Sequence, residues 1–463
     1  MKRLVVVAAL AALAGCGLGP DYQPPRAETP AEWSVPLATQ ARGEEWWQAF
    51  DDPQMAALVV RALAANPNLM AAEASVRAAR ALAEKQAGGS LPQLDLSGDA
   101  SRARTPATQS TAATKTKAQV ANSFATGFDA SWELDLWGKL ARGVEAAVAS
   151  AEASRAEADG VRLTLIGDVL RNYTELRGYQ LRLKVAGETV AAYADTVDLT
   201  RVQFNAGTGT GLAVVRAEAQ LASSRADLPS LQAQLRVRLH ALSILTGQAP
   251  AALAALLGEN KPVPRLIARP GLGMPADLVR QRPDLRQAER ELASATAEIG
   301  VAEADLYPTL SLGGSIGLSA ASAGSLVELA ARSWSFGPSL VLPLFDGGTR
   351  RAELAYRRAK AEQAEAAWRQ SVLTALAEVE DALITWDRQQ ARRDGLIAAV
   401  HTSRAAFDLA AELNAKGMSD YLDVLDAQRE LRSLEAQLAE AEVAAATDAI
   451  TLYKAVGGGV ALP

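Results

Sequence analysis

The sequence predicts an α+β membrane protein in which β-barrel strands alternate with very long α-helices. Three observations support this fold class. Residues 124–220 and 334–430 follow one plan, a strand of alternating apolar and polar residues that leads into a long helix. No proline lies between Pro106 and Pro229 or after Pro343 until the final residue. Both windows are rich in alanine, which favours helix strongly. The chain therefore contains an internal duplication.

Composition excludes several classes of protein. The 463 residues are 49% hydrophobic, and the mean hydropathy of +0.01 is not that of a helical membrane protein. The formal net charge is -6. Proteins that bind nucleic acid, or that use a polybasic segment to bind a membrane surface, carry positive charge where they bind. We therefore expect no nucleic acid among the partners.

The N-terminus reads as an export signal. Lys2 and Arg3 precede an apolar run of about 10 residues, which is too short to span a bilayer. The run ends in Leu-Ala-Gly-Cys, which resembles a bacterial lipobox and predicts a covalent lipid on Cys16. An ordinary signal peptide with an incidental cysteine is the alternative. One acyl chain binds a membrane only weakly, so stable attachment of the protein needs a second membrane contact.

We divide the chain into a signal peptide (1–15), a lipidated tether (16–50), a first repeat (51–275) and a second repeat (276–463). The tether is punctuated by prolines and is predicted to be extended. Within the first repeat we expect strands at about 91–102 and 124–136, helices at about 137–204 and 212–247, and an equatorial segment at about 248–275. Within the second we expect strands at about 309–319 and 334–344, and helices at about 345–413 and 418–455.

The predicted strands have one apolar and one polar face. In the strand at 124–136 the acidic face holds Asp129, Glu133 and Asp135. In the strand at 334–344 the apolar face extends to Leu340, Leu342 and Leu344. Such alternation is typical of a membrane barrel wall; the core of a soluble sandwich is the alternative. The aromatic residues predicted to face lipid are Phe124, Phe128, Trp132, Trp334 and Phe336.

The helices are long enough to cross a periplasm. A helix over 137–204 is about 100 Å long, and its return helix is half that length. A third helix at about 277–305 completes the return. Apolar residues recur at spacings of four and three, which predicts coiled-coil packing. The two seams are Leu163, Ile166, Leu170 and Tyr173, and Val372, Leu376, Val379, Leu383 and Trp386.

Four strands cannot close a barrel, because known membrane barrels begin at eight. An open sheet edge in lipid would leave backbone groups unpaired at a cost of several kcal/mol each. We therefore predict that the barrel is shared between copies of the chain. Strand counting requires at least two copies and does not choose between two, three and four.

Catalysis has few candidate residues. The two histidines, His240 and His401, lie in different helical regions and neither has metal-ligand spacing. The sole cysteine is assigned to lipid attachment. The run of glycines and threonines at 207–211 lacks the lysine and the preceding strand of a phosphate loop. The sequence predicts no enzyme, no metal and no cofactor other than the lipid on Cys16.

Several short motifs are spread along the chain: Gly19-Pro20-Asp21-Tyr22, Trp46-Trp47, Phe50-Asp51-Asp52-Pro53, Arg282-Pro283-Asp284-Leu285-Arg286 with Ala288-Glu289, Leu306-Tyr307-Pro308, and Tyr421 to Arg429. Together they resemble one family, the TolC-like outer-membrane efflux proteins, in the lipoprotein branch that works with RND-type pumps. The resemblance covers essentially the whole mature chain. It implies a homotrimer with a twelve-stranded outer-membrane barrel and a coiled-coil helical tunnel across the periplasm. It also implies a periplasmic adaptor (membrane fusion) protein and an inner-membrane RND-type transporter as partners.

The turns at the far ends of the long helices are the predicted gate. Asp420, Asp423 and Asp426 are three residues apart and are expected on one helical face. In a trimer they would form acidic rings, which the resemblance also implies for this constriction and which favour cations. An ordinary solvated face is the alternative.

In the first repeat the positions 210 residues earlier are Thr210, Ala213 and Arg216. We hypothesise that Arg216 or Lys416 pairs with the aspartates across neighbouring helices and holds the entrance shut.

The functional expectation is a passive outer-membrane duct for efflux of drugs or other small molecules, anchored by lipid and extending into the periplasm. A duct for type I protein secretion is the alternative of the same class. A structural periplasmic lipoprotein without a pore is the alternative of another class, but a tether has no use for four amphipathic strands.

Overall fold

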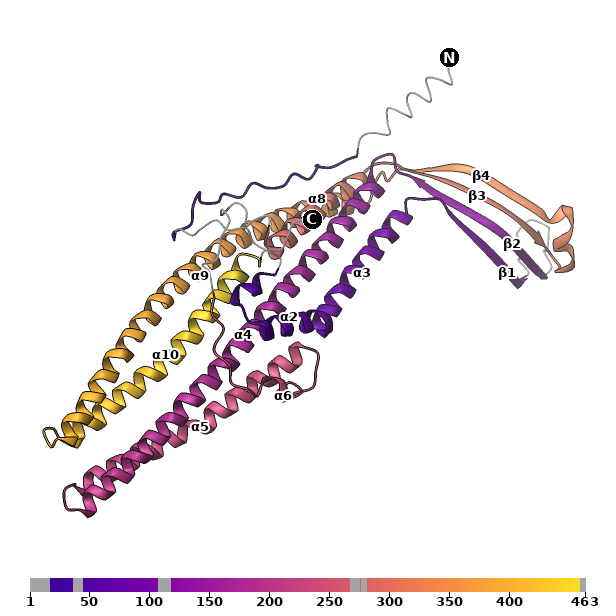
Figure 1. Cartoon of the computed structure of the whole chain (residues 1–463). Helices are drawn as coiled ribbons and strands as arrows, with labels where there is room; N and C mark the ends of the chain where they lie inside the picture. Colours follow the sequence, from indigo (N-terminus) through magenta and orange to yellow (C-terminus); the bar gives the residue numbers. More distant parts are fainter. Residues whose placement is uncertain (1–16, 36–44, 107–117, 267–274, 276–280, 459–463) are drawn as a thin grey trace. The chain divides into compact units, whose positions relative to one another are not determined.

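The computed structural model describes the chain apart from residues 1–16, 36–44, 107–117, 267–274, 276–280 and 459–463 (Figure 1). The predicted lipid site at Cys16 lies outside the described residues. The chain divides into two compact units. We call the unit of Ser75–Ser154, Gln287–Trp368 and the N-terminal residues to Pro25 the sheet unit. The unit of Arg26–Ala74, Arg155–Arg286 and Arg369–Pro463 is the helical unit.

The sheet unit holds one antiparallel sheet of four strands in the order β1-β2-β3-β4 (Figure 1). The strands are β1 (Gln93–Thr105), β2 (Gln119–Leu134), β3 (Thr309–Ala320) and β4 (Arg332–Val341). Strands from both repeats therefore pair through β2 and β3. The order leaves β1 and β4 as sheet edges.

Cross-strand register places the apolar residues on one face. Phe128 lies opposite Leu96 on one side and Ile316 on the other, and Ile316 lies opposite Trp334. Directly opposed residues share a face of an antiparallel sheet. The same register puts Asp129 opposite both Asp95 and Ser315 on the other face. The sheet therefore has the two-faced character that the sequence predicts.

Both returning strands end earlier than expected. β2 ends at Leu134, so Asp135 is not on the polar face of the strand; its carboxylate accepts a hydrogen bond from the Ala141 amide (2.8 Å) at the start of the next helix. β4 ends at Val341, so Leu342 and Leu344 lie beyond it. The carboxylate of Asp346 then accepts from the Gly348 amide (2.9 Å). Each strand is thus followed by an aspartate whose carboxylate accepts from amides at the start of the next helix.

The long helices repeat at a constant offset of 210 residues. Helix α4 (Lys139–Asn205) and α9 (Thr349–Ala415) each have 67 residues. The return helices α5 (Gly211–Leu245) and α10 (Tyr421–Ala455) each have 35. Each pair forms an antiparallel hairpin (Figure 1). Helix α9 begins at Thr349 rather than near 345, because Gly347 and Gly348 have φ of 67° and 89°, which is not helical.

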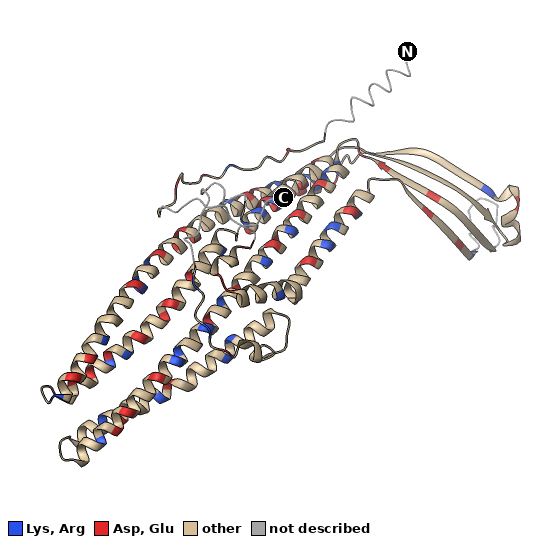
Figure 2. Ribbon diagram, in the orientation of Figure 1, with Lys and Arg blue, Asp and Glu red and all other residues tan. Residues whose placement is uncertain are grey.

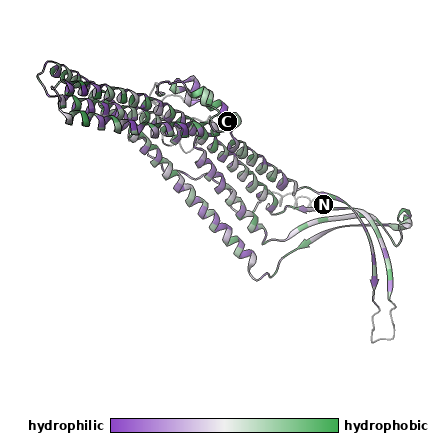
Figure 3. Ribbon diagram, turned by 90° about the horizontal axis from the view of Figure 1, so that it is seen from below, coloured by the Kyte–Doolittle hydropathy of each residue, from purple (hydrophilic) through white to green (hydrophobic). Residues whose placement is uncertain are grey.

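The packing seams follow the predicted spacing. In α4 the four seam residues Leu163, Ile166, Leu170 and Tyr173 are all buried. In α9 the buried residues include Val372, Val379, Leu383 and Trp386, while Leu376 is half-buried and Ala375 takes its place in the core. Hydrophobic and hydrophilic residues are interleaved along these helices (Figure 3), as expected when one side of each helix packs and the other is exposed.

The remaining described elements are short or flank the hairpins. They are the 3-10 helices η1 (Trp46–Phe50), η2 (Gly324–Val327) and η3 (Leu329–Ala331), and the helices α2 (Pro53–Ala65), α3 (Pro67–Gly88), α6 (Ala254–Leu257) and α8 (Pro283–Ala304). Among the described residues no single helix is long and apolar enough to cross a membrane; α2 and α3 pass the test only as a pair bent by 45°.

Candidate functional site

The two hairpin tips have the same backbone turn. After α4, Gly207 has φ of 74° and donates its amide to the Phe204 carbonyl (3.0 Å), while Thr208 donates to the Gln203 carbonyl (2.9 Å). These two bonds define a Schellman motif, which needs a residue with positive φ. The tip after α9 repeats both bonds 210 residues later, through Leu413, Asn414, Gly417 and Met418. The sequence duplication therefore extends to the individual hydrogen bonds.

The residues that begin the return helices differ in charge. Thr210 is the N-cap of α5, and its hydroxyl accepts from the Ala213 amide (3.3 Å). Asp420 is the N-cap of α10, and its carboxylate accepts from the Leu422 amide (3.3 Å). The expectation that Asp420 shares a helical face with Asp423 and Asp426 is therefore wrong, because Asp420 has extended backbone and precedes the helix. Its carboxylate stabilises the helix start.

The other predicted gate residues are exposed at the second tip and on α5. Asp423 is in the first turn of α10, and Asp426 lies 3.4 Å from Arg429. Lys416, in the turn after α9, forms an ion pair with Glu412 of α9. Arg216 is exposed on α5 and forms no ion pair with a described residue. Within one chain the structure thus brings neither cation onto the aspartates, and pairing between chains remains a proposal.

The hairpins contact each other within the helical unit. Above the tips, the Thr196 hydroxyl donates to the buried Gln428 side chain (3.2 Å), which joins α4 to α10. Farther along, Arg182 pairs with Glu440 (2.9 Å) between the same helices. Burial raises the pKa of the Tyr193 hydroxyl, which lies in the small apolar core between α4 and α5. Both signs of charge recur along the long helices (Figure 2).

The five aromatic residues predicted to face lipid lie on one face of the sheet. Phe128 is 48%, Trp334 79% and Phe336 70% exposed, although each is apolar. Exposing so many large apolar side chains to water is unfavourable in a soluble protein, whereas their exposure suits contact with lipid. Trp132 is half-buried and its indole donates to the Ser90 carbonyl (3.0 Å). Phe124 lies opposite Ala100 and Ala320 in the register.

The opposite face of the sheet is polar. Asp95 and Asp129 oppose each other directly, and the Ser97 hydroxyl donates to the Asp129 carboxylate (2.9 Å). Further across, the hydroxyls of Ser315 and Ser335 are hydrogen-bonded (2.8 Å). Two carboxylates placed opposite each other repel unless water or cations screen them. This face is therefore suited to an aqueous lumen.

Within the sheet unit, the segment that follows the predicted lipid site is docked against the start of α4 and against α8, which the sequence did not predict. The Leu18 amide donates to the Trp137 carbonyl (3.0 Å), and its carbonyl accepts from Arg142 (3.2 Å). Arg142 also pairs with Asp21 (2.6 Å). A Cβ on Gly300 would lie 2.7 Å from the Leu18 carbonyl oxygen, so only glycine permits this approach. The glycine of the first sequence motif, Gly19, has φ of 86°.

Two buried arginines join the helices of the helical unit, and sequence reasoning assigned them no role. Arg282 donates to the Ala455 carbonyl at the end of α10 (2.9 Å) and pairs with Asp284 (2.7 Å) and Glu378 (2.6 Å). It therefore links α8, α9 and α10. The motif around Arg282 was recognisable in the sequence, but its partners lie 96 and 173 residues away.

Arg177 is fully buried in α4. Its guanidinium donates to the Gln180 side chain (2.6 Å) and to the Glu259 carbonyl (2.6 Å), and it lies 4.9 Å from the centre of the Tyr173 ring. It therefore fastens the equatorial segment to α4. A lone arginine in a helical pattern is usually exposed, so the sequence offered no signal for this contact.

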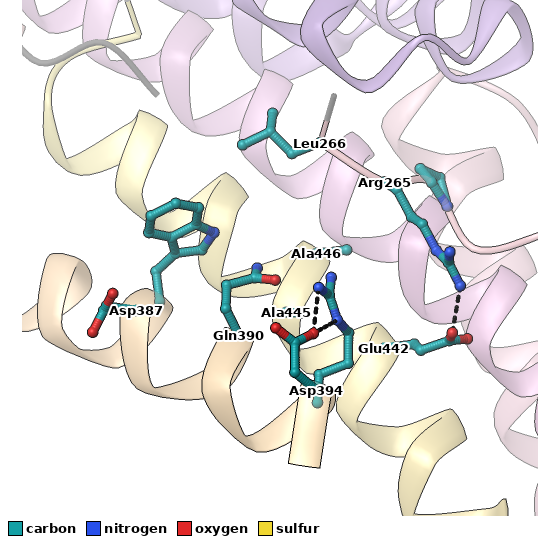
Figure 4. A pocket seen from close by; sticks show the side chains of 11 residues that line it. Arg265, Leu266, Asp387, Gln390, Asp394, Glu442, Ala445 and Ala446 are labelled. Carbon is teal, nitrogen blue, oxygen red and sulfur yellow. Dashed lines mark hydrogen bonds and ion pairs between the residues drawn. The ribbon is translucent and has the colours of Figure 1, made fainter. Parts of the chain in front are cut away.

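One cavity of about 330 Å³ lies between α9, α10 and the equatorial segment (Figure 4). Its arginines are already paired, Arg265 with Glu442 and Arg393 with Asp394 (2.8 Å). Among the described residues no group of three His, Cys, Asp or Glu side chains is placed to hold a metal ion.

Comparison with known proteins gives one consistent answer. The model of the family described as "Outer membrane efflux protein" matches residues 58–248 and 274–458. Nodulation protein T of Rhizobium leguminosarum bv. trifolii is 34% identical over 96% of this chain and 95% of its own length. The toluene efflux pump outer membrane protein TtgI of Pseudomonas putida is 31% identical over 97% of both chains.

Solved structures agree with the sequence comparisons. The outer-membrane channel OprN superposes with a TM-score of 0.89 at 36% identity, covering 96% of this chain and 99% of that one. The open state of the MtrE outer membrane channel of Neisseria gonorrhoeae gives a TM-score of 0.84 at 26% identity, covering 96% and 99%.

Proposed function

Because this chain belongs to the outer membrane efflux protein family, we propose that it is the exit duct of a tripartite efflux system. Members of this family are channels of the outer membrane rather than enzymes. In the proposed system the duct conducts passively. An inner-membrane RND-type transporter supplies energy and selects substrates, and a periplasmic adaptor couples the two. The substrates would be drugs or other small molecules.

The observation that carries this proposal is a two-faced sheet with two edges, joined to two 67-residue helices. One sheet face is apolar and exposed and the other carries the carboxylates. In lipid the edges β1 and β4 must pair, and copies of the same chain offer matching edges. Three copies would give twelve strands and a closed barrel. Helices of about 100 Å would then continue the conduit into the periplasm.

We further propose that the membrane attachment is double. A lipid on Cys16 would add a second anchor to the barrel, and the docking of Leu18 onto Trp137 and Arg142 would hold that lipid beside the sheet unit. The hairpin tips would face the adaptor. There Asp423 and Asp426 would form rings, and Arg216 or Lys416 of neighbouring helices would hold them closed.

The relatives favour small-molecule efflux over protein secretion. TtgI is named for toluene efflux, and OpmQ of Pseudomonas aeruginosa, 30% identical over 99% of this chain, is named for pyoverdine export. Nodulation protein T carries no substrate in its name. We therefore keep protein secretion as the second candidate and a structural lipoprotein as the third.

Deletion of the gene in its source bacterium tests the proposed function. We expect cells to retain a fluorescent efflux dye, and the wild-type chain to restore its release. The secreted proteome should not change. Loss of a secreted protein with normal dye release would favour the secretion duct. Weakened envelopes with both transport activities intact would favour the structural lipoprotein.

A further inference from the structure

The charged residues of the sheet are sorted by sign onto its two faces. The four strands contain four acidic and three basic residues. The acidic residues are Asp95, Asp99, Asp129 and Glu133, and the basic ones are Arg102, Arg104 and Arg332. All residues of odd number on β1 lie on the face of Asp95, whereas Arg102 and Arg104 have even numbers and share the face of Leu94 and Leu96.

Cross-strand register gives the same answer for the third arginine. Arg332 lies opposite Leu318, and Leu318 lies opposite Thr126, two residues from Phe128. Trp334 is the next residue along β4 on that face. All three arginines are therefore on the apolar face, and all four carboxylates are on the polar one. The carboxylates and the arginines lie on opposite faces of the sheet, so they do not form ion pairs with one another across it.

The arginines also lie at one end of the strands. Arg102 and Arg104 are near the end of β1, and Arg332 begins β4. The opposite ends of these strands connect to α3 and α9. From Leu94 to Arg102 the strand rises about 27 Å, or about 20 Å along the membrane normal for the usual tilt. This is close to the apolar band of a membrane barrel. The arginines therefore come just after the hydrocarbon ends.

On the proposed function, on which this inference rests, that end faces the exterior and that face meets lipid. We propose that Arg102, Arg104 and Arg332 bind the phosphate groups of outer-leaflet lipids. Arginine on a lipid-facing strand is unfavourable at the midplane and nearly neutral at the headgroups. A guanidinium recognises phosphate through paired N–H donors. None of the three forms an ion pair with a described residue, so their donors remain for such a ligand.

Trp334 supplies the reporter. Its ring is 79% exposed on the same face as Arg332 and two residues away. Purified oligomer is reconstituted in phosphatidylcholine vesicles that contain brominated phosphatidic acid, or brominated phosphatidylcholine for comparison. Bromine quenches only tryptophan in contact with the acyl chains, and subtraction of a Trp334→Phe sample isolates Trp334. In the wild-type protein we expect brominated phosphatidic acid to quench Trp334 more strongly than brominated phosphatidylcholine does. This difference should become smaller as the salt concentration is raised.

Substitutions then assign the preference to the arginines. In the triple variant Arg102→Gln, Arg104→Gln and Arg332→Gln, the preference for phosphatidic acid over phosphatidylcholine should fall by about fivefold for each arginine removed. The triple Arg→Lys variant keeps the charge and should keep most of the preference. Asp99→Asn, on the other face of β1, should leave it unchanged. If the glutamine variant does not assemble, the salt dependence of the lipid preference in the wild-type protein tests the proposal instead.

Three results would overturn the inference: equal quenching by both lipids in wild type, preference that survives in the glutamine variant, or abolition by inorganic phosphate at the same ionic strength. The last would reveal a site for free phosphate. Conductance of the same samples in planar bilayers separates this failure from failure of the proposed function. A conducting oligomer without lipid preference refutes only the lipid site, whereas an oligomer that stays silent even when it carries Asp423→Ala and Asp426→Ala refutes the duct.

Discussion

At the scale of single residues, the gate proposal concerns two carboxylates rather than three. Asp423 and Asp426 are exposed on α10, while Asp420 is engaged as the N-cap. We expect Asp423→Ala with Asp426→Ala to raise single-channel conductance severalfold, because the proposed links between neighbouring helices are removed. Cation preference should fall as the negative charge is lost. Planar bilayer recordings measure both effects.

The matched control for that pair is Glu362→Ala, an exposed acidic residue in the first part of α9. It should leave conductance unchanged. Unchanged conductance in the double aspartate variant would remove these residues from the gate. Arg216→Ala and Lys416→Ala made separately then identify the partner, since only the true partner should reproduce the rise.

Asp346 makes stability depend on pH. The amides of Arg350 and Gly348 donate to its carboxylate and hold its pKa below the ordinary value of 3.8. A lowered folded-state pKa means that the ionised group stabilises the fold above its ordinary pKa. That contribution is lost as pH falls through the folded-state pKa. Asp346→Ala should therefore lower the thermal midpoint at pH 7, and its deficit should shrink in strong acid.

Circular dichroism of the helical signal at a series of pH values checks this prediction. The same deficit at every pH would mean that the charge of Asp346 is not what stabilises the start of α9.

At the scale of elements, the sequence predicted the helices better than the strand ends. Spacing and absence of proline fixed the hairpins to within a few residues, because helix periodicity is local. The end of β2 was misplaced because Asp135 alternates correctly with the strand residues yet caps a helix. The end of β4 was misplaced because Leu342 and Leu344 continue the apolar alternation beyond the strand. The contacts of Arg177 and Arg282 could not be predicted, since their partners are remote in sequence.

The candidate site was predictable in part for the same reason. The Schellman glycines and the 210-residue offset follow from local sequence, and so did the apolar strand face. The N-cap role of Asp420 was missed because a spacing of three also suits a helical face. Docking of Leu18 and Asp21 depends on a close approach to Gly300 from another part of the chain, which no local pattern indicates.

The paired tip glycines offer a test at this scale. Gly207→Ala and Gly417→Ala should each cost about 1 kcal/mol, because a side chain is disfavoured at positive φ. Hydrogen exchange of the Thr208 and Met418 amides should accelerate about fivefold at the mutated tip alone. Gly395→Ala is the control: it lies inside α9 with no atom within 4 Å of an added Cβ, so it should stabilise slightly. Equal exchange in all three variants would contradict the turn assignment.

The docked N-terminal segment offers a second test at the scale of elements. In Gly300→Val the new side chain would meet the Leu18 carbonyl and Arg142, so the segment should be released. We expect a protease to cleave after residue 17 at least tenfold faster, while the oligomer persists. Gly313→Ala, in β3 with open space around it, is the matched control. Unchanged cleavage would mean that Gly300 is not what permits docking.

At the scale of the whole molecule, one chain is incomplete. Its sheet has two edges and two unlike faces, and its hairpins repeat one design with different charges at the two tips. In the proposed assembly, copies of the chain would complete the sheet, and the duplicated hairpins would supply a wall around one conduit. The charge difference between Thr210 and Asp420 marks where the two halves of the chain diverge.

Conductance of the purified oligomer in planar bilayers tests this account most directly. We predict discrete, long-lived channels from the intact oligomer, and none after heating has separated it into single chains. The contradicting result is an oligomer that inserts into the bilayer, as judged by protease protection of its strands, and yet passes no current under any applied voltage or in the Asp423→Ala, Asp426→Ala variant.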